Sequence, residues 1–167
     1  MTEIKKILVP CDFSKESHAA MNYACMFAEN TGASIDVLHV WDQPRYLESQ
    51  TILQNASGQQ SLLDFVKAQA EEEMKKFLAH PKRDEKIVIH KRYQLGVPHE
   101  QILDLVRKES FDLIVMGTHG RSGISHTILG SVAEKVLREA PCPVITVKSS
   151  HIDPRKKYEH KDLTPGM

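Results

Sequence analysis

Strand-like and helix-like segments alternate along most of this sequence, and the alternation constrains the fold more than any other feature. Short apolar runs typical of strands occur at residues 4–9, 33–41, 86–94, 111–116 and 144–147. Between them, apolar residues recur at helical spacing. Strands that alternate with helices usually pair in parallel, so the sequence predicts an α/β domain with a five-stranded parallel sheet and helices on both faces. Right-handed crossovers then favour a doubly wound sheet.

Capping residues predict where the helices begin and end. Ser14 is suited to cap the first helix, because its hydroxyl can accept from a free N–H of the first turn, and Gly32 is suited to end it. Pro98 stands where the first turn of the third helix needs no N–H donor. The second helix is predicted over residues 61–79 and the fourth over residues 131–139.

The chain is expected to form one domain over residues 1–148, followed by a polar tail at residues 149–167. Residues 42–60 are polar and contain Pro44 and Gly58, so we expect a long loop inserted into the domain. The tail is expected to be a loosely held extension.

Composition and charge exclude several classes of function. Lysine plus arginine and aspartate plus glutamate both number 22, whereas nucleic-acid-binding proteins usually have a basic excess. No apolar stretch approaches the ~20 residues that span a membrane. Three separated cysteines without a CxxC pair indicate thiols in a reducing compartment, so we expect a cytoplasmic protein. The nine histidines show no metal-ligand spacing, so no metal site built by the protein is expected.

Two unusual segments follow the first and fourth predicted strands. The first strand leads into Pro10 and Asp12, and the fourth ends at Met116 before a glycine-rich stretch. In open parallel sheets, ligands bind at the carboxyl ends of strands where the strand order reverses. A strand order of 3-2-1-4-5 brings both segments to one crevice at this point.

The glycine-rich stretch has features that suit a phosphate. Its glycines permit positive φ and close approach of the backbone to a ligand; they are Gly117, Gly120 and Gly123. Gly130 and Ser131 stand at a helix start, where free N–H groups and the helix dipole attract an anion. Arg121 and His119 offer side-chain donors.

Each signal also has a structural interpretation. Glycine-rich turns after strands are common, and Pro10 with Asp12 can simply end a strand and begin a helix. Asp12 also has the chemistry to accept hydrogen bonds from two ribose hydroxyls. The two signals at one crevice favour a nucleotide site. The sequence lacks GxxxxGK[ST] and has no GxGxxG after the first strand, so neither a P-loop nor the usual dinucleotide fold is expected.

Several separated motifs resemble one known family. Gly117-x-x-Gly120, nine residues, and then Gly130-Ser131 resemble the nucleotide-binding signature of the ATP-binding universal stress proteins. Further stretches resemble the family in the same order, at residues 7–14, 96–98, 102–103, 131–137 and 140–144. The resemblance covers roughly residues 3–148.

The resemblance implies a 3-2-1-4-5 sheet of the adenine nucleotide alpha hydrolase-like type, with ATP or AMP bound between the first and fourth strands. It implies that Asp12 holds the ribose and that the adenine pocket is lined by Pro10, Val40 and Met116. It also implies a phosphate cradle formed by Gly117, Gly120, Gly130, Ser131 and Val132. A magnesium ion is expected only with the nucleotide phosphates. Family members usually form homodimers, often through the last strand, here residues 144–147.

The resulting hypothesis is a regulatory or stress-response protein that acts as a nucleotide-dependent switch. The glycine-rich stretch contains one arginine but no lysine, and Asp12 is the only carboxylate that the sequence places nearby, so hydrolysis is expected to be slow or absent. Two alternatives stay open. One is a slow ATPase or a nucleotidyl-transfer enzyme of the same fold group, although SGGxDS-like and HxGH-like motifs are absent. The other is a protein-interaction module with a vestigial nucleotide site.

Overall fold

A computed structural model of the chain describes residues 3–41, 52–55, 58–79, 84–119 and 129–148. Its main sheet has five parallel strands in the order β5-β2-β1-β6-β7. The strands are β1 (Lys6–Cys11), β2 (Ser34–Trp41), β5 (Ile89–Leu95), β6 (Leu113–Gly117) and β7 (Val144–Val147). Numbered within this sheet alone, the order is 3-2-1-4-5, which confirms the predicted doubly wound topology.

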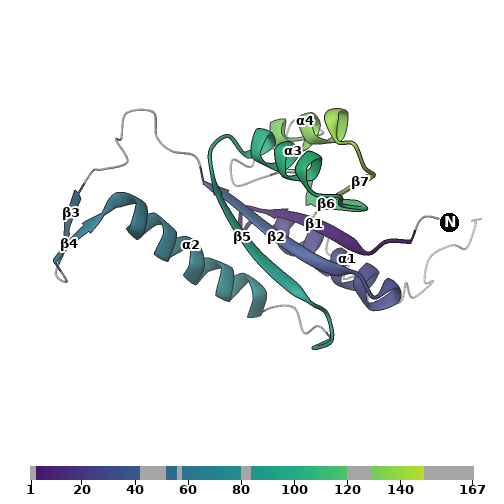
Figure 1. The fold of residues 1–167 in the computed structure, drawn as a ribbon, viewed down its shortest axis with the longest axis horizontal. Coiled ribbons are helices and arrows are strands. Elements are labelled where there is room, and N and C mark those ends of the chain that lie inside the picture. The colour runs from purple at the N-terminus through teal and green to yellow at the C-terminus, as the bar shows by residue number, and fades with distance from the viewer. Residues whose placement is uncertain (1–2, 42–51, 56–57, 80–83, 120–128, 149–167) are drawn as a thin grey trace, which may run out of the picture.

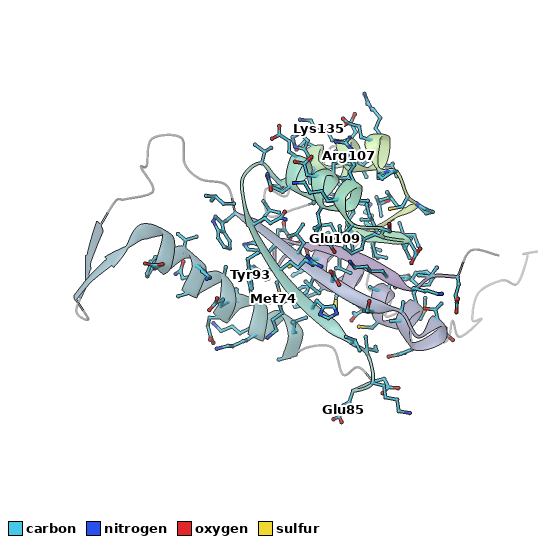
Figure 2. The ribbon with its side chains drawn as sticks, in the orientation of Figure 1. Met74, Glu85, Tyr93, Arg107, Glu109 and Lys135 are labelled. Atoms are coloured by element: carbon cyan, nitrogen blue, oxygen red, sulfur yellow. The ribbon has the colours of Figure 1, made fainter. Side chains whose placement is uncertain are left out.

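Helices cover both faces of the sheet (Figure 1). They are α1 (Lys15–Thr31), α2 (Leu62–Ala79), α3 (Pro98–Lys108) and α4 (Ser131–Glu139). One core cluster joins α1 and the C-terminal part of α2 to the sheet, and it includes Met74 and Tyr93, both labelled in Figure 2. A second cluster joins α3 and α4 to the opposite face. Each helical layer therefore buries its own side of the sheet.

Local capping explains why α1 begins and ends where the sequence predicts. The Ser14 hydroxyl accepts a hydrogen bond from the Ser17 N–H at 3.2 Å, which supplies one of the partners that the first turn lacks. Gly32 adopts the left-handed conformation at φ 75°, and its N–H donates to the Ala28 carbonyl at 2.8 Å.

The insertion contains regular structure that the sequence analysis did not predict. Within residues 42–60, expected to be a long loop, the chain forms β3 (Ile52–Asn55) and begins β4 (Gly58–Ser61). These strands pair antiparallel in a separate two-stranded sheet. Figure 1 shows the pair beside the start of α2, away from the main sheet. Residues 42–51 and the tail at 149–167 lie outside the described residues.

A charge network crosses the sheet beneath the end of α3. Asp36 is fully buried on β2 and accepts from the Arg92 Nε at 2.5 Å. Arg92 also donates twice to Glu109, at 2.8 Å for each bond, and Glu109 accepts from the Lys6 Nζ at 2.5 Å. Figure 2 labels Glu109, which caps the C-terminal end of α3. The network thus ties β1, β2 and β5 to α3.

Opposite charges in this network stabilise one another. The pKa of Glu109 lies below its ordinary value of 4.5. The hydrogen bond from Lys6 has the largest lowering effect, burial opposes it, and the contacts with Arg92 lower the pKa further. Buried ion pairs seldom add much net stability over apolar packing, but removing one partner leaves an uncompensated charge. Among the residues of the network, we therefore expect the loss of the Asp36 side chain to lower the free energy of unfolding most.

We predict that Asp36→Ala lowers the free energy of unfolding by about 3 kcal/mol, the low end for a broken buried pair, because Arg92 keeps Glu109. Denaturant titration measures the change. Glu134→Ala is the matched control, since its exposed pair with Arg138 at 2.8 Å should contribute only about 0.3–0.5 kcal/mol. Equal losses in the two variants would show that the Asp36 network contributes no more than an exposed pair.

Candidate functional site

The crevice between β1 and β6 arises because the two strands separate at their carboxyl ends. Their pairing runs from Ile7 with Leu113 to Leu8 with Ile114 and stops there. The Lys6 carbonyl accepts from the N–H of Asp112, just before β6, and the Lys5 carbonyl accepts from the N–H of Ser34 in β2. The backbone N–H and C=O groups of even-numbered residues in β1 therefore point toward β6. Pro10 is therefore the next residue whose N–H would face β6, and proline has none.

A cavity of about 380 Å³ opens at this separation. This volume lies within the usual range for small-molecule sites, roughly 300–1,000 Å³. Most of its wall is apolar, and the apolar side chains come from β1, β2, β6, α3 and α4. They are those of Pro10, Leu38, Val40, Pro98, Ile102, Met116, Val132 and Ala133. The structure therefore brings together Pro10, Val40 and Met116, the three residues expected to line one pocket.

Asp12 lines the same cavity from the turn between β1 and α1. Its Oδ1 accepts from the Ser14 N–H at 3.0 Å and from the Ser17 hydroxyl at 2.6 Å. The next residue, Phe13, has φ 64°, a conformation that bulky residues rarely adopt. The Phe13 ring packs against those of His39 and Phe77, with centroids 4.3 and 5.8 Å away. This packing helps hold the turn that presents Asp12.

The N-terminus of α4 forms another part of the wall. Gly130 is its N-cap, with no side-chain hydrogen bond to the cap, and the Gly130 N–H donates to the Thr118 carbonyl at 2.7 Å. The first helical bond at this end runs from the Glu134 N–H to the Gly130 carbonyl. The N–H groups of Ser131, Val132 and Ala133 therefore have no acceptor within the helix. All three residues line the cavity, where the helix dipole favours an anion.

Two of the expected glycines are packed closely against their own chain. Gly117 was expected to permit positive φ and close approach of the backbone to a ligand, but within the described ranges only Gly32 and Gly96 are glycines with positive φ, so Gly117 does not use that conformational freedom. A Cβ at Gly117 would lie 2.7 Å from the Glu16 Cβ, and one at Gly130 would lie 3.0 Å from the Thr118 carbonyl oxygen. Close packing against their own chain explains both glycines.

Other expected residues fall outside the part of the chain that the structure describes. Gly120, Arg121 and Gly123 all lie within residues 120–128. Their expected contribution to a phosphate cradle remains a prediction from the motif. His119 lies at the edge of this segment, lines the cavity, and has its Nδ1 3.1 Å from the Thr118 Oγ1.

Several residues around the site were missed by sequence reasoning. Ser17, Leu38, Pro98, Ile102 and Thr118 also line the cavity. Leu38 lies two residues before Val40 on β2, so strand alternation places both on one face. Ile102 follows Pro98 by one helical turn. Glu16 lies against Gly117, so Asp12 is not the only acidic residue close to the crevice.

The described residues were also compared with the requirements of a metal site and of a membrane-spanning helix, and they meet neither. Across these ranges, no three histidine, cysteine, aspartate or glutamate side chains are grouped as a metal site would require. None of the described helices is both long and apolar enough to cross a membrane. The three cysteines are present as thiols, and burial raises the pKa of Cys142.

We predict that Gly117→Ala lowers the free energy of unfolding by about 1–3 kcal/mol, because the added methyl overpacks the contact between β6 and α1. Glu16→Gly removes the opposing Cβ, at a cost of about 1 kcal/mol for glycine within a helix. The double variant should be more stable than the sum of the two losses implies, as thermal and denaturant unfolding would show. Strict additivity would contradict the close contact.

Comparison with known proteins gives consistent matches over most of the chain. The model of the Universal stress protein family matches residues 3–148. Universal stress protein MJ0531 of Methanocaldococcus jannaschii is 34% identical over 145 residues, which cover 86% of this chain and 82% of that protein. The solved structure of MJ0577, a protein of the same organism, aligns with a TM-score of 0.73 and 26% sequence identity. The alignment covers 90% of this chain and 100% of the MJ0577 chain.

A further solved structure, described as a universal stress protein in complex with cAMP, has a TM-score of 0.60. It covers 89% of this chain and all of its own, with 21% sequence identity. At this identity, the likeness shows that the two chains share a fold.

Proposed function

The chain belongs to the universal stress protein family, and from this premise we propose that it is a stress-response regulator that binds ATP or AMP in the crevice between β1 and β6. One observation carries the proposal: Asp12 and the N-terminus of α4 line the same apolar cavity. An adenine nucleotide has the matching parts, namely an apolar base, a ribose diol and an anionic phosphate. A protein with the same fold is described in complex with cAMP, which supports an adenine nucleotide as the ligand.

We assign each part of the nucleotide to residues of matching chemistry. Adenine is assigned to the apolar wall and the ribose to Asp12, whose carboxylate can accept from hydroxyl groups. The phosphates are assigned to the N–H groups in the first turn of α4, which have no acceptor within the helix. In full, the proposed contacts are Pro10, Val40 and Met116 for the base, Asp12 for the ribose, and Gly117, Gly120, Arg121, Gly130, Ser131 and Val132 for the phosphates.

We propose that the protein holds its nucleotide and hydrolyses it slowly or not at all. Fast phosphoryl transfer requires neutralisation of phosphate charge and a positioned nucleophile. None of the described residues that line the cavity is a lysine or an arginine. A Mg²⁺ ion would arrive with the phosphates of ATP. Occupancy of the site by nucleotide, rather than hydrolysis, would then set the conformation of the protein or its affinity for a partner.

We also propose a cytoplasmic location, because all three cysteines are present as thiols, which fits a reducing compartment.

We predict that the wild-type protein binds AMP or ATP in calorimetry and that Asp12→Asn weakens binding about tenfold. The loss corresponds to a hydrogen bond to a charged acceptor. Asp104→Asn is the control, because this carboxylate is exposed on α3 and pairs only loosely with Arg107, at 3.9 Å. Absence of binding to the wild-type protein at millimolar nucleotide would overturn the proposed function. Equal affinity in Asp12→Asn would remove Asp12 from the site.

We also propose a homodimer formed through β7, which lies at the edge of the sheet. The Pro143 carbonyl accepts from Ile114 of β6, and the Val147 carbonyl accepts from Thr118, directly after β6. The N–H groups of Val144 and Thr146 therefore face outward. Unpaired edge groups of this kind are a template for another strand. The apolar character of the strand adds to this tendency.

Thr146→Pro removes one outward N–H and should therefore convert the dimer to a monomer, whereas Thr146→Val keeps the N–H and should remain dimeric. Light scattering after size exclusion measures the mass, which for one chain is 18.9 kDa. A wild-type monomer, or a Thr146→Pro dimer, would show that β7 is not the interface.

A further inference from the structure

Ser17 is a buried polar residue of the cavity wall, only 4% exposed, and its role was not anticipated from the sequence. We propose that Ser17 is a positioning residue that fixes the carboxylate of Asp12 for recognition of the ribose diol. The inference rests on the proposed function, because it concerns how the same site selects a ribonucleotide. It is carried by the hydrogen bonds of the turn between β1 and α1.

The direction of each hydrogen bond at Ser17 follows from the chemistry of its neighbours. The Asp12 N–H donates to the Ser17 Oγ at 3.1 Å, and the Ser14 hydroxyl donates to it at 3.3 Å. A hydroxyl has two acceptor positions and one donor proton, so both acceptor positions are occupied. The single proton is then donated to the Asp12 Oδ1 at 2.6 Å. Ser17 is thereby locked into one orientation.

The same bonds hold the carboxylate of Asp12 at one of its oxygens. Oδ1 accepts from the Ser17 hydroxyl and from the Ser14 N–H. Because Ser17 and the Ser14 backbone hold Oδ1 at two points, the plane of the carboxylate is set before the nucleotide arrives, and such preorganisation improves affinity.

The helix itself explains how Ser17 reaches this position. Ser14 is the N-cap of α1, so Ser17 stands at the third helical position, where glutamate or glutamine usually reaches back to the N-cap N–H in a capping box. Here Asp12 accepts from that N–H instead, and the shorter Ser17 side chain binds Asp12. Asp12, which also lines the cavity, thus takes the role of the glutamate or glutamine of a capping box, while Ser14 remains the N-cap.

The test compares the affinities for AMP and for 2′,3′-dideoxyadenosine monophosphate, which lacks both ribose hydroxyls. The wild-type protein should prefer AMP, and Ser17→Ala should lose about tenfold of that preference, the effect of one charge-assisted hydrogen bond. Affinity for the dideoxy compound should change little, because base and phosphate contacts remain. Calorimetry of both ligands gives the ratio directly.

Three further variants separate positioning from a general effect on α1. Ser14→Ala removes the cap hydroxyl, so it lowers stability and removes the weaker of the two donors to the Ser17 Oγ. The Asp12 N–H still donates to Ser17, and Ser17 still donates to the Asp12 Oδ1, so the wild-type ratio should largely persist. Ser17→Thr keeps a hydroxyl and should keep the ratio. Ser17→Cys fills the same space with a weak donor and should lower it. If Ser17→Ala does not fold, the contrast between Ser17→Thr and Ser17→Cys decides.

The outcomes distinguish the inference from the proposed function. A wild-type protein that binds neither nucleotide overturns both. A wild-type protein that prefers AMP, with an unchanged ratio in Ser17→Ala and Ser17→Cys, overturns the role of Ser17 and leaves the proposed function intact. Equal losses of affinity for both ligands in Ser17→Ala, or a ratio reduced as far in Ser14→Ala as in Ser17→Ala, would also overturn it, because Ser17 would then only support the start of α1.

Discussion

The position of β1 between β2 and β6 determines where the rest of the structure can place a ligand site. From β1, the sheet grows through β2 to one edge and through β6 to the other, so the loops at the carboxyl ends diverge on either side of it. Pairing with β6 ends at Leu8 and Ile114, while β2 remains paired with β1 through Cys11. Pro10 fits this asymmetry, because its missing N–H falls on the side where the strands separate.

The turn after β1 combines structural and functional roles in a few residues. Asp12 accepts from the first turn of α1, and Phe13 adopts a strained φ of 64°. Strain of this kind persists when surrounding packing holds it, and it is often found at functional sites. Here the packing includes His39 of β2 and Phe77 of α2. The geometry of the turn that presents Asp12 therefore depends on the packing of α2, a helix that is distant from this turn in the sequence.

Sequence reasoning succeeded where a local cause determined the structure. The start and end of α1 follow from Ser14 and Gly32, and α4 begins at Ser131 as predicted. The doubly wound parallel sheet followed from the alternation of elements and from crossover handedness, and its order 3-2-1-4-5 followed from the resemblance to the universal stress proteins. The β3–β4 pair was missed because neither strand has the apolar alternation that marks a strand buried on one face, and composition alone indicated a loop.

The site was predicted less completely, because its walls depend on packing between distant elements. Pro10, Val40 and Met116 were expected and do line the cavity, and strand alternation with Val40 also predicts Leu38, but Ile102 reaches the cavity only through the docking of α3 on the sheet. Glycine at position 117 was attributed to positive φ and to close approach of the backbone to a ligand, whereas the structure shows that a Cβ there would collide with Glu16. Such contacts between α1 and β6 cannot be seen in a local sequence pattern.

We propose that one nucleotide spans the cavity from the apolar wall to the N-terminus of α4. A crystal structure of the protein grown with AMP tests this proposal most directly. We predict electron density for the base against Val40 and Met116, for the ribose beside Asp12, and for the phosphate at the N–H groups of Ser131 and Val132. AMP density located elsewhere, or a cavity without nucleotide at saturating AMP, would contradict it.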